Sequence, residues 1–178
     1  MCNSAKEKGN CLEYTDSGLP KTAIEFEVNG DRFEKKVDPT MTLLQLLNNE
    51  LKLFGAKEGC GEGECGACSI IMNGKAVNSC LVLAAEADGA TILTVEGLGQ
   101  GNKLSILQQA FIEYDALQCG FCTPGMLMSA RSLLDRVPDP DDDEIKEAIE
   151  GNFCRCTGYI PIINAIRSAA KREREALK

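Results

Sequence analysis

The sequence predicts an α+β fold in two parts, and three observations lead to this prediction. In the first part apolar and polar residues alternate, and two Asn-Gly dipeptides, at 29–30 and 73–74, mark tight hairpin turns. A glycine-rich segment over 97–102 then breaks the pattern. After it, apolar residues recur every three or four positions, which is typical of amphipathic helices. We therefore expect two domains, over 22–97 and 98–178.

The first domain is expected to have a β-grasp arrangement, in which one helix packs across two hairpins and a closing strand. Period-two alternation indicates the strands, and a stripe of leucines at helical spacing indicates the helix. In chain order, the expected elements are strands within 22–37, a helix over 43–51 that Thr40 or Thr42 can cap, strands within 69–79 and a strand over 91–95.

The second domain is expected to be an all-α four-helix bundle. Four apolar stripes follow the glycine-rich segment, and the basic residues after the last stripe suit the negative end of a helix dipole. The stripes are Leu104, Leu107, Ala110 and Phe111; Met126, Leu127, Ala130, Leu133 and Leu134; Ile145, Ala148 and Ile149; and Ile162, Ile163, Ile166 and Ala170.

Composition argues against several classes of function. The net charge of −8 disfavours binding to nucleic acids or to anionic lipid, and no apolar run approaches the ~20 residues that span a bilayer. There is no histidine, which removes imidazole acid–base catalysis and a Rieske-type centre. Residues 1–21 are polar and aperiodic, so we expect a flexible tail in which Cys2 and Cys11 are free thiols. The start of the chain shows no export signal, so we expect a cytoplasmic protein with reduced cysteines.

Four cysteines in a glycine-rich stretch predict a first iron–sulfur site. Their spacing, C-x4-C-x2-C-x11-C, is the plant-type pattern of [2Fe–2S] ligands. Glycines allow positive φ angles and bring backbone N–H groups close to a cluster, and we expect Gly63 and Gly66 to be needed for this reason. Zinc and disulfides are the alternatives, but structural zinc sites usually contain two C-x2-C pairs. The candidate ligands are Cys60, Cys65, Cys68 and Cys80.

A second set of four cysteines lies in the helical part, with the spacing C-x2-C-x31-C-x-C. Each pair precedes an expected helix start that contains a proline, and Thr123 is the expected N-cap of the first of these helices. Two helix N-termini at one site would favour thiolates and a negatively charged cluster. This spacing alone leaves zinc open, whereas the first set beside it favours a relay of two clusters. The candidate ligands are Cys119, Cys122, Cys154 and Cys156.

Three stretches together resemble the small iron–sulfur subunit of the molybdenum hydroxylases, the family of xanthine dehydrogenase, aldehyde oxidoreductase and aerobic carbon monoxide dehydrogenase. They are 59–68 (GCGEGECGAC), 118–125 (QCGFCTPG) and 152–159 (NFCRCTGY). The likeness runs from about Thr22 to the last helix, and all eight cysteine positions of the pattern are present. The first twenty or so residues lie outside it.

The resemblance implies a plant-type ferredoxin-like domain with one [2Fe–2S] cluster near its surface, and a helical domain with a second, buried [2Fe–2S] cluster. It implies an electron-transfer subunit without a catalytic residue of its own. A large partner subunit would carry molybdopterin, in a dinucleotide form, and the substrate pocket. A medium subunit would carry FAD, and the complex would dimerise. Electrons would pass from the molybdopterin through the helical-domain cluster and the ferredoxin-like cluster to FAD or another acceptor, with Gln118 and Cys156 close to the pterin.

Two other functions remain open from the sequence alone. A stand-alone two-cluster electron carrier would also suit an acidic surface. A zinc-stabilised binding module would use the same cysteines without redox chemistry, and it would be colourless where an iron–sulfur protein is red-brown.

Overall fold

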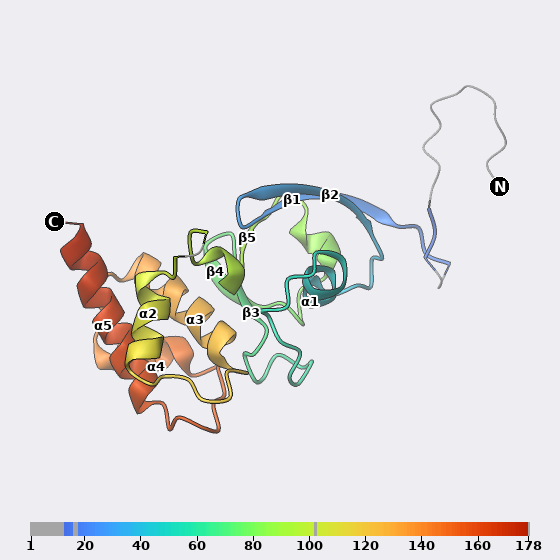
Figure 1. Ribbon diagram of the computed structural model, residues 1–178. Helices are drawn as coiled ribbons and strands as arrows, with labels where there is room; N and C mark the ends of the chain where they lie inside the picture. Colours follow the sequence, from blue (N-terminus) through green and yellow to red (C-terminus); the bar gives the residue numbers. More distant parts are fainter. Residues whose placement is uncertain (1–12, 16–17, 102, 178) are drawn as a thin grey trace, which may run out of the picture.

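The computed structural model describes residues 13–15, 18–101 and 103–177. A sheet with one short helix lies at one end of the molecule, and the longer helices gather at the other end, next to the C-terminus (Figure 1). The prediction of free thiols at Cys2 and Cys11 concerns residues outside the described ranges. The described residues before the sheet make a turn, in which the backbone N–H of Lys21 donates to the carbonyl oxygen of Glu13 over 2.7 Å.

Five strands in the described part of the chain form one mixed sheet with the order β2-β1-β5-β3-β4. Only β1 and β5 run parallel; the other neighbours are antiparallel. Both predicted hairpin turns are present, and each has positive φ angles at its Asn-Gly dipeptide. The strands are β1 (Thr22–Val28), β2 (Asp31–Val37), β3 (Ser69–Met72), β4 (Lys75–Asn78) and β5 (Thr91–Leu93).

The predicted helix over 43–51 is present in an altered form. It starts as a single α-turn, α1 (Leu43–Gln45), and continues as a π-helix, η1 (Leu46–Glu50). The Thr42 hydroxyl accepts a hydrogen bond from Gln45 N over 3.2 Å, so Thr42 is the cap of the two candidates. The α-turn and the π-helix each bury two leucines in the cluster that packs on the sheet, which explains why the spacing looked helical. These leucines are Leu43, Leu44, Leu46 and Leu47.

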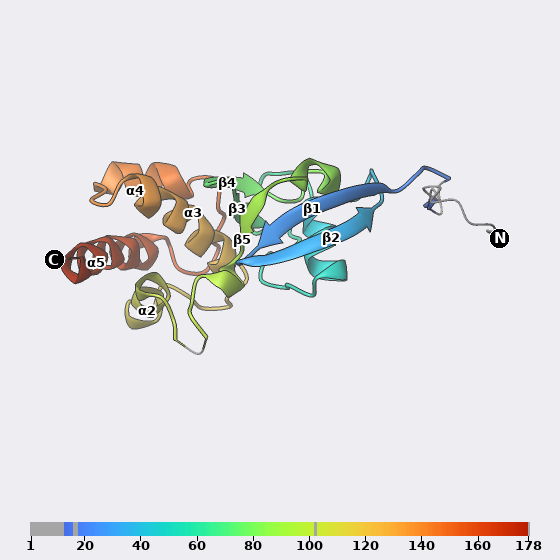
Figure 2. The same ribbon diagram turned by 90° about the horizontal axis from the view of Figure 1, so that it is seen from above.

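Over residues 103–177, the helical end contains four helices, and α3 runs between its neighbours with one end beside strand β3 (Figure 2). Their predicted apolar stripes are buried or half-buried, except that Leu104 precedes the first helix and is exposed. No helix in the described ranges is long and apolar enough to cross a membrane. The helices are α2 (Ile106–Glu113), α3 (Thr123–Arg136), α4 (Asp142–Ile149) and α5 (Ile160–Ala176).

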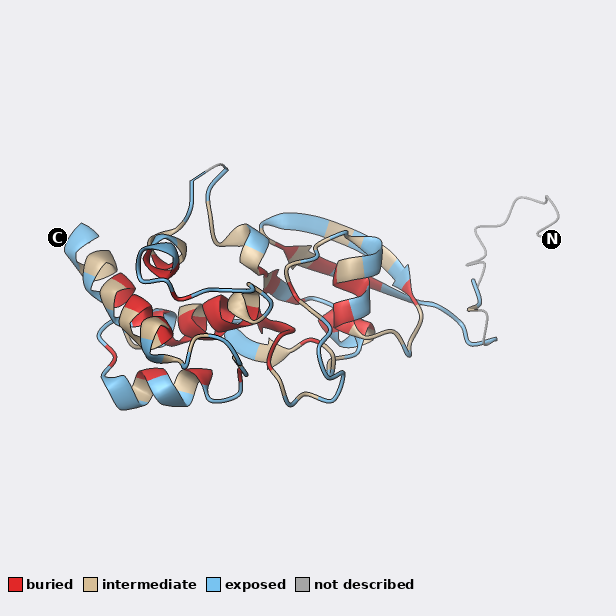
Figure 3. Cartoon of the chain, turned by 60° about the horizontal axis from the view of Figure 1, so that its bottom comes forward, coloured by how far each residue is buried: buried red, intermediate tan, exposed pale blue. Residues whose placement is uncertain are grey.

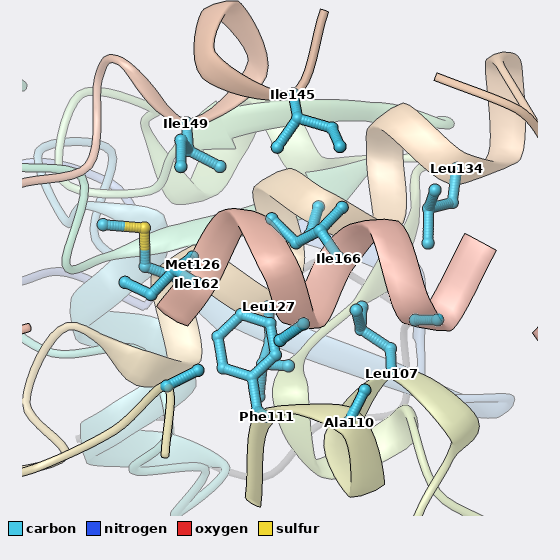
Figure 4. Close-up of a cluster of buried hydrophobic side chains, with 14 of the residues drawn as sticks. Leu107, Ala110, Phe111, Met126, Leu127, Leu134, Ile145, Ile149, Ile162 and Ile166 are labelled. Atoms are coloured by element: carbon cyan, nitrogen blue, oxygen red, sulfur yellow. The ribbon is translucent and has the colours of Figure 1, made fainter. Parts of the chain in front are cut away.

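Most buried hydrophobic residues that the structure describes belong to one of two clusters, one between the sheet and α1 and one among the helices (Figure 3). In the helical cluster Phe111 of α2 lies among residues of α3 and α5, with Ile145 of α4 across from them (Figure 4). Val95 and Leu98 pack against this cluster although they lie at the end of the sheet part. The glycine-rich segment therefore begins inside the packed structure.

The predicted last strand is shorter than expected, because Thr94 leaves the sheet to bind the first hairpin turn. Its backbone N–H donates to Oδ1 of Asn29 over 2.9 Å, and its hydroxyl accepts from Nδ2 of Asn29 over 2.9 Å. The Thr94 hydroxyl also donates to Glu96, whose other oxygen accepts from Gly55 N over 2.7 Å. These bonds connect the start of the first cysteine loop to the segment that leads into the helices.

Candidate iron–sulfur sites

The first cysteine loop connects η1 to β3 and has the backbone that the glycines predict. Gly61, Gly63 and Gly66 have φ angles of 71°, 80° and 65°. A side chain on Gly63 would also meet Leu81, since a Cβ atom there would lie 2.3 Å from Cδ1 of Leu81. The prediction that Gly63 and Gly66 adopt positive φ angles is therefore confirmed.

The four thiols of the first site, three from this loop and Cys80 from the segment after β4, lie in two facing pairs, Cys60 with Cys65 and Cys68 with Cys80. Hydrogen bonds from backbone N–H groups, first that of Glu62 and then that of Cys65, lower the pKa of Cys60 to about 7. Burial, followed by the hydrogen bond with Cys68, raises the pKa of Cys80 to about 11. Cys60 is exposed and Cys68 is buried, so one edge of this site faces solvent.

Three polar side chains of the neighbouring hairpin are hydrogen-bonded to the backbone of the loop. The sequence analysis did not predict this role. Nδ2 of Asn78 donates to the carbonyl oxygen of Gly63 over 2.7 Å. The Ser69 and Ser79 hydroxyls donate to the carbonyl oxygens of Gly66 and Cys68, both over 2.8 Å. Both serines are buried, and each adjoins a candidate cysteine ligand in the sequence, which is the signal by which they could have been found.

The second cysteine set lies in the loops before α3 and α5, and its thiols also form two pairs. Sγ of Cys119 lies 3.7 Å from Sγ of Cys156, and Cys122 faces Cys154. Two thiolates on one tetrahedral metal with bonds of about 2.3 Å lie about 3.8 Å apart, which is close to the first of these separations. Nε2 of Gln118 donates to the carbonyl oxygen of Cys156 over 3.2 Å. The structure therefore brings Gln118 and Cys156 together, although they are far apart in the sequence.

The two thiol pairs of the second site have different surroundings. Burial, then Cys154 and Cys119, raise the pKa of Cys122 to about 12. Burial also acts to raise the pKa of Cys154, but hydrogen bonds from the Thr157 side chain and backbone outweigh it and leave that pKa below its ordinary value. Cys119 and Cys156 are exposed, whereas Cys122 and Cys154 are half-buried. The second site is thus open to solvent on one side in this chain, which differs from the buried cluster implied by the resemblance.

The predicted helix start after Cys122 is shifted by one residue. Thr123 is already the first residue of α3, and Cys122 occupies the N-cap position without a side-chain cap bond. The expectation that Thr123 caps the helix is therefore wrong. Its hydroxyl oxygen is buried and has no hydrogen-bond partner among the described residues. Pro124 was predicted at the first helical position and lies at the second position of α3; Pro161 likewise lies at the second position of α5.

The two sites touch each other through Asn152 and Phe153, which precede Cys154. The backbone N–H of Phe153 donates to the carbonyl oxygen of Cys65 over 2.9 Å. Nδ2 of the buried Asn152 donates to the carbonyl oxygen of Gly66 over 2.8 Å, and its Oδ1 accepts from the Ser129 hydroxyl over 2.6 Å. A continuous covalent and hydrogen-bonded route therefore runs from Cys65 to Cys154.

Replacing Asn152 by alanine is expected to loosen this contact. The Ser129 hydroxyl would lose its acceptor, and a buried group without a partner costs about 1–3 kcal/mol. We expect the amide hydrogen of Phe153 to exchange faster with deuterium, because its bond to Cys65 would open more often. Hydrogen–deuterium exchange read by mass spectrometry measures this rate. Asn49→Ala, at an exposed asparagine, is the control, and equal exchange in both variants would contradict the clamping role of Asn152.

The donor sets fit [2Fe–2S] clusters. Each site offers four thiols in two pairs, and one pair on each iron is the arrangement that a two-iron cluster needs. In the part of the chain that the structure describes, no three or more His, Cys, Asp or Glu side chains converge to hold a single metal ion. Backbone N–H groups point at Cys60 and Cys154, as hydrogen-bond donors to a cluster would.

Comparison with known proteins identifies both halves. Residues 26–95 match the family described as "2Fe-2S iron-sulfur cluster binding domain", and residues 94–167 match the "[2Fe-2S] binding domain" family. The nicotinate dehydrogenase small FeS subunit of Eubacterium barkeri is 50% identical over 86% of this chain and 98% of its own length. The chain belongs to the family of small iron–sulfur subunits of the molybdenum hydroxylases.

Other members of this family agree with the assignment. The nicotine 6-hydroxylase small subunit of Paenarthrobacter nicotinovorans is 52% identical over 87% of this chain and 93% of its own length. In the crystal structure of quinoline 2-oxidoreductase from Pseudomonas putida 86, one chain matches with a TM-score of 0.83 and 46% identity, over 87% of this chain and 97% of that one. Aldehyde oxidoreductase from Desulfovibrio gigas matches with a TM-score of 0.84 and 40% identity, over 87% of this chain but 17% of that one.

Membership in this family establishes the fold and the general function of the chain. The small iron–sulfur subunit described here has a ferredoxin-like [2Fe–2S] domain with a mixed sheet and a helical [2Fe–2S] domain. It is an electron-transfer subunit of an oxidoreductase complex. The prediction of the family and of two [2Fe–2S] clusters is confirmed.

Proposed function

We propose that the chain is a relay with one [2Fe–2S] cluster in each domain, the domains covering 22–97 and 98–178 behind a tail of residues 1–21. Bound clusters would supply one-electron transfer, and the protein would hold them at a fixed separation. The facing thiol pairs support this ligand assignment. The proposed ligands are Cys60, Cys65, Cys68 and Cys80 for the first cluster, and Cys119, Cys122, Cys154 and Cys156 for the second.

The hydrogen bond from Phe153 N to the Cys65 carbonyl oxygen is the observation that best supports the proposed relay. Cys65 is a proposed ligand of one cluster, and Phe153 is covalently bonded to Cys154, a proposed ligand of the other. A relay needs a short connection between its two centres, whereas two independent metal sites would not. The buried Asn152 adds a second hydrogen bond between the two sites, from its Nδ2 to the carbonyl oxygen of Gly66.

The inner end of the relay would be the exposed side of the second site. Gln118 and Cys156 are hydrogen-bonded to each other there, and both are exposed. We propose that this side faces the molybdopterin of a larger partner subunit, which would cover Cys119 and Cys156. Phe121 and Phe153 are 48% and 60% exposed near the same loops, which suits a surface that becomes buried on assembly.

The remaining parts of the proposal concern the assembly. The outer cluster would deliver electrons to FAD on a medium subunit, and the complex would dimerise. Helices α2 to α5 would form the four-helix bundle expected for the second domain. We infer a cytoplasmic location, because eight reduced thiolates are needed for the two clusters. Co-purification from the native host, with identification of the associated chains, tests the subunit composition.

We expect each chain to bind four irons and four acid-labile sulfides. Dithionite reduction should give two distinguishable EPR signals, because one site is a glycine loop and the other lies between two helix starts. Iron and sulfide analysis together with EPR spectroscopy measures this. A complex that is fully active with two irons per chain would contradict the two-cluster assignment.

A further inference from the structure

The Thr157 hydroxyl lies beside a proposed ligand of the inner cluster. Its oxygen is 3.1 Å from Sγ of Cys154. It also accepts a hydrogen bond from the backbone N–H of Tyr159 over 3.3 Å. A hydroxyl that accepts one hydrogen bond still has its own hydrogen to donate, and a thiolate bound to iron has none. The bond between the two side chains therefore runs from Thr157 to Cys154 when the cluster is bound.

The backbone of residues 157–159 holds the Thr157 hydroxyl in place. Gly158 and Tyr159 both have left-handed backbones, with φ angles of 67° and 68°, and this turn directs the Tyr159 N–H back to Thr157. A tyrosine in this conformation is strained, so it persists only where other contacts hold it. The Tyr159 hydroxyl supplies such contacts, because it accepts from Cys154 N over 2.8 Å and donates to the Asn152 carbonyl oxygen over 3.2 Å.

We propose that Thr157 is a positioning residue that tunes the reduction potential of the helical-domain cluster through its hydrogen bond to Cys154. Reduction adds one negative charge to a cluster that four thiolates already make negative. A donor to a thiolate stabilises the more negative state more strongly, which raises the potential. The inference rests on the proposed ligand set, since it requires Cys154 to bind iron.

The test is a redox titration, followed by EPR, of the full chain with both clusters. Thr157→Val removes the hydroxyl and keeps the shape and the backbone N–H, whereas Thr157→Ser keeps the hydroxyl. We expect the reduction potential of the inner cluster to fall by about 59 mV in the valine variant, which corresponds to a tenfold change in the equilibrium constant for one-electron reduction. The serine variant should keep the wild-type potential. The outer cluster is the internal control and should not shift in either variant.

Several results would overturn the proposal. An unchanged inner potential in Thr157→Val, with four irons bound, would show that the hydroxyl does not tune the cluster. Equal shifts in the valine and serine variants would assign the effect to packing. Thr157→Ala provides a second variant without added bulk. If neither the valine nor the alanine variant loads the inner cluster while serine does, the hydroxyl serves assembly and not tuning. Absence of a second cluster in the wild-type protein would instead contradict the ligand set itself.

Discussion

Changing Cys65 to serine in the assembled complex is expected to stop steady-state turnover while substrate still reduces the inner cluster once. The change removes one proposed thiolate of the outer cluster. It leaves the Cys65 carbonyl oxygen, which accepts the hydrogen bond from Phe153, so the contact between the two sites should persist. Electrons should then stop at the helical-domain cluster. Stopped-flow spectroscopy of the complex separates this single reduction from turnover.

The matched control for this experiment is Cys156→Ser at the other end of the relay. Because Cys156 is a proposed ligand of the inner cluster, its loss should interrupt the path one step earlier, and neither cluster should be reduced by substrate. Reduction of the final acceptor at the wild-type rate in Cys65→Ser would show that the outer cluster is not on the path. Identical single-turnover behaviour of both variants would contradict the proposed order of the clusters.

Replacing Gly66 by alanine is expected to disturb both cysteine sites at once. Its φ angle of 65° already costs a residue with a Cβ atom about 1–2 kcal/mol. That Cβ would also lie 2.4 Å from both Nδ2 of Asn152 and the carbonyl oxygen of Gly151, and crowding of this kind typically costs a further ~1–3 kcal/mol. Since Asn152 leads directly into Cys154, we expect both clusters to be weakened and not the first alone.

Iron content and the temperature at which the cluster absorbance is lost measure the effect of Gly66→Ala. The control is Gly74→Ala, because Gly74 has a φ angle of 79° and a Cβ atom there would meet no other atom within 4 Å. The control variant should suffer only the backbone cost and should keep four irons. If both variants lost iron equally, steric contact with the helical half would not be the reason that Gly66 is glycine.

The sequence alone was enough to predict the structural features that depend on local spacing. The Asn-Gly turns, the strand over 69–72 and the buried faces of the helices were all predicted, because each depends on neighbours in the chain. The π-helix was not, since the same leucines satisfy an α-helical and a π-helical spacing over so few residues. Leu104 fitted the stripe of α2 by position, but the helix begins after Ser105, whose hydroxyl accepts from Gln108 N.

The cysteine spacing gave the candidate ligands, but it could not give how the thiols pair. Cys119 faces Cys156 and Cys122 faces Cys154 because two loops far apart in the sequence meet, and no local pattern encodes that meeting. The role of Asn152 could not be predicted for the same reason. Its partners lie in β3, in α3 and in the first loop, and the sequence shows only an asparagine before a cysteine motif.

The contact around Gly66 limits how such relays can be rearranged by recombination. Gly125 of α3 fits against it, since a Cβ atom at Gly125 would lie 2.2 Å from the Gly66 carbonyl oxygen. A chimera joined within residues 97–102 would take its ferredoxin half from one parent and its helical half from another. It would succeed only where the first parent has glycine at 66 and the second has glycine at 125 and asparagine at 152. The two halves therefore depend on each other at this contact, although each has its own hydrophobic core.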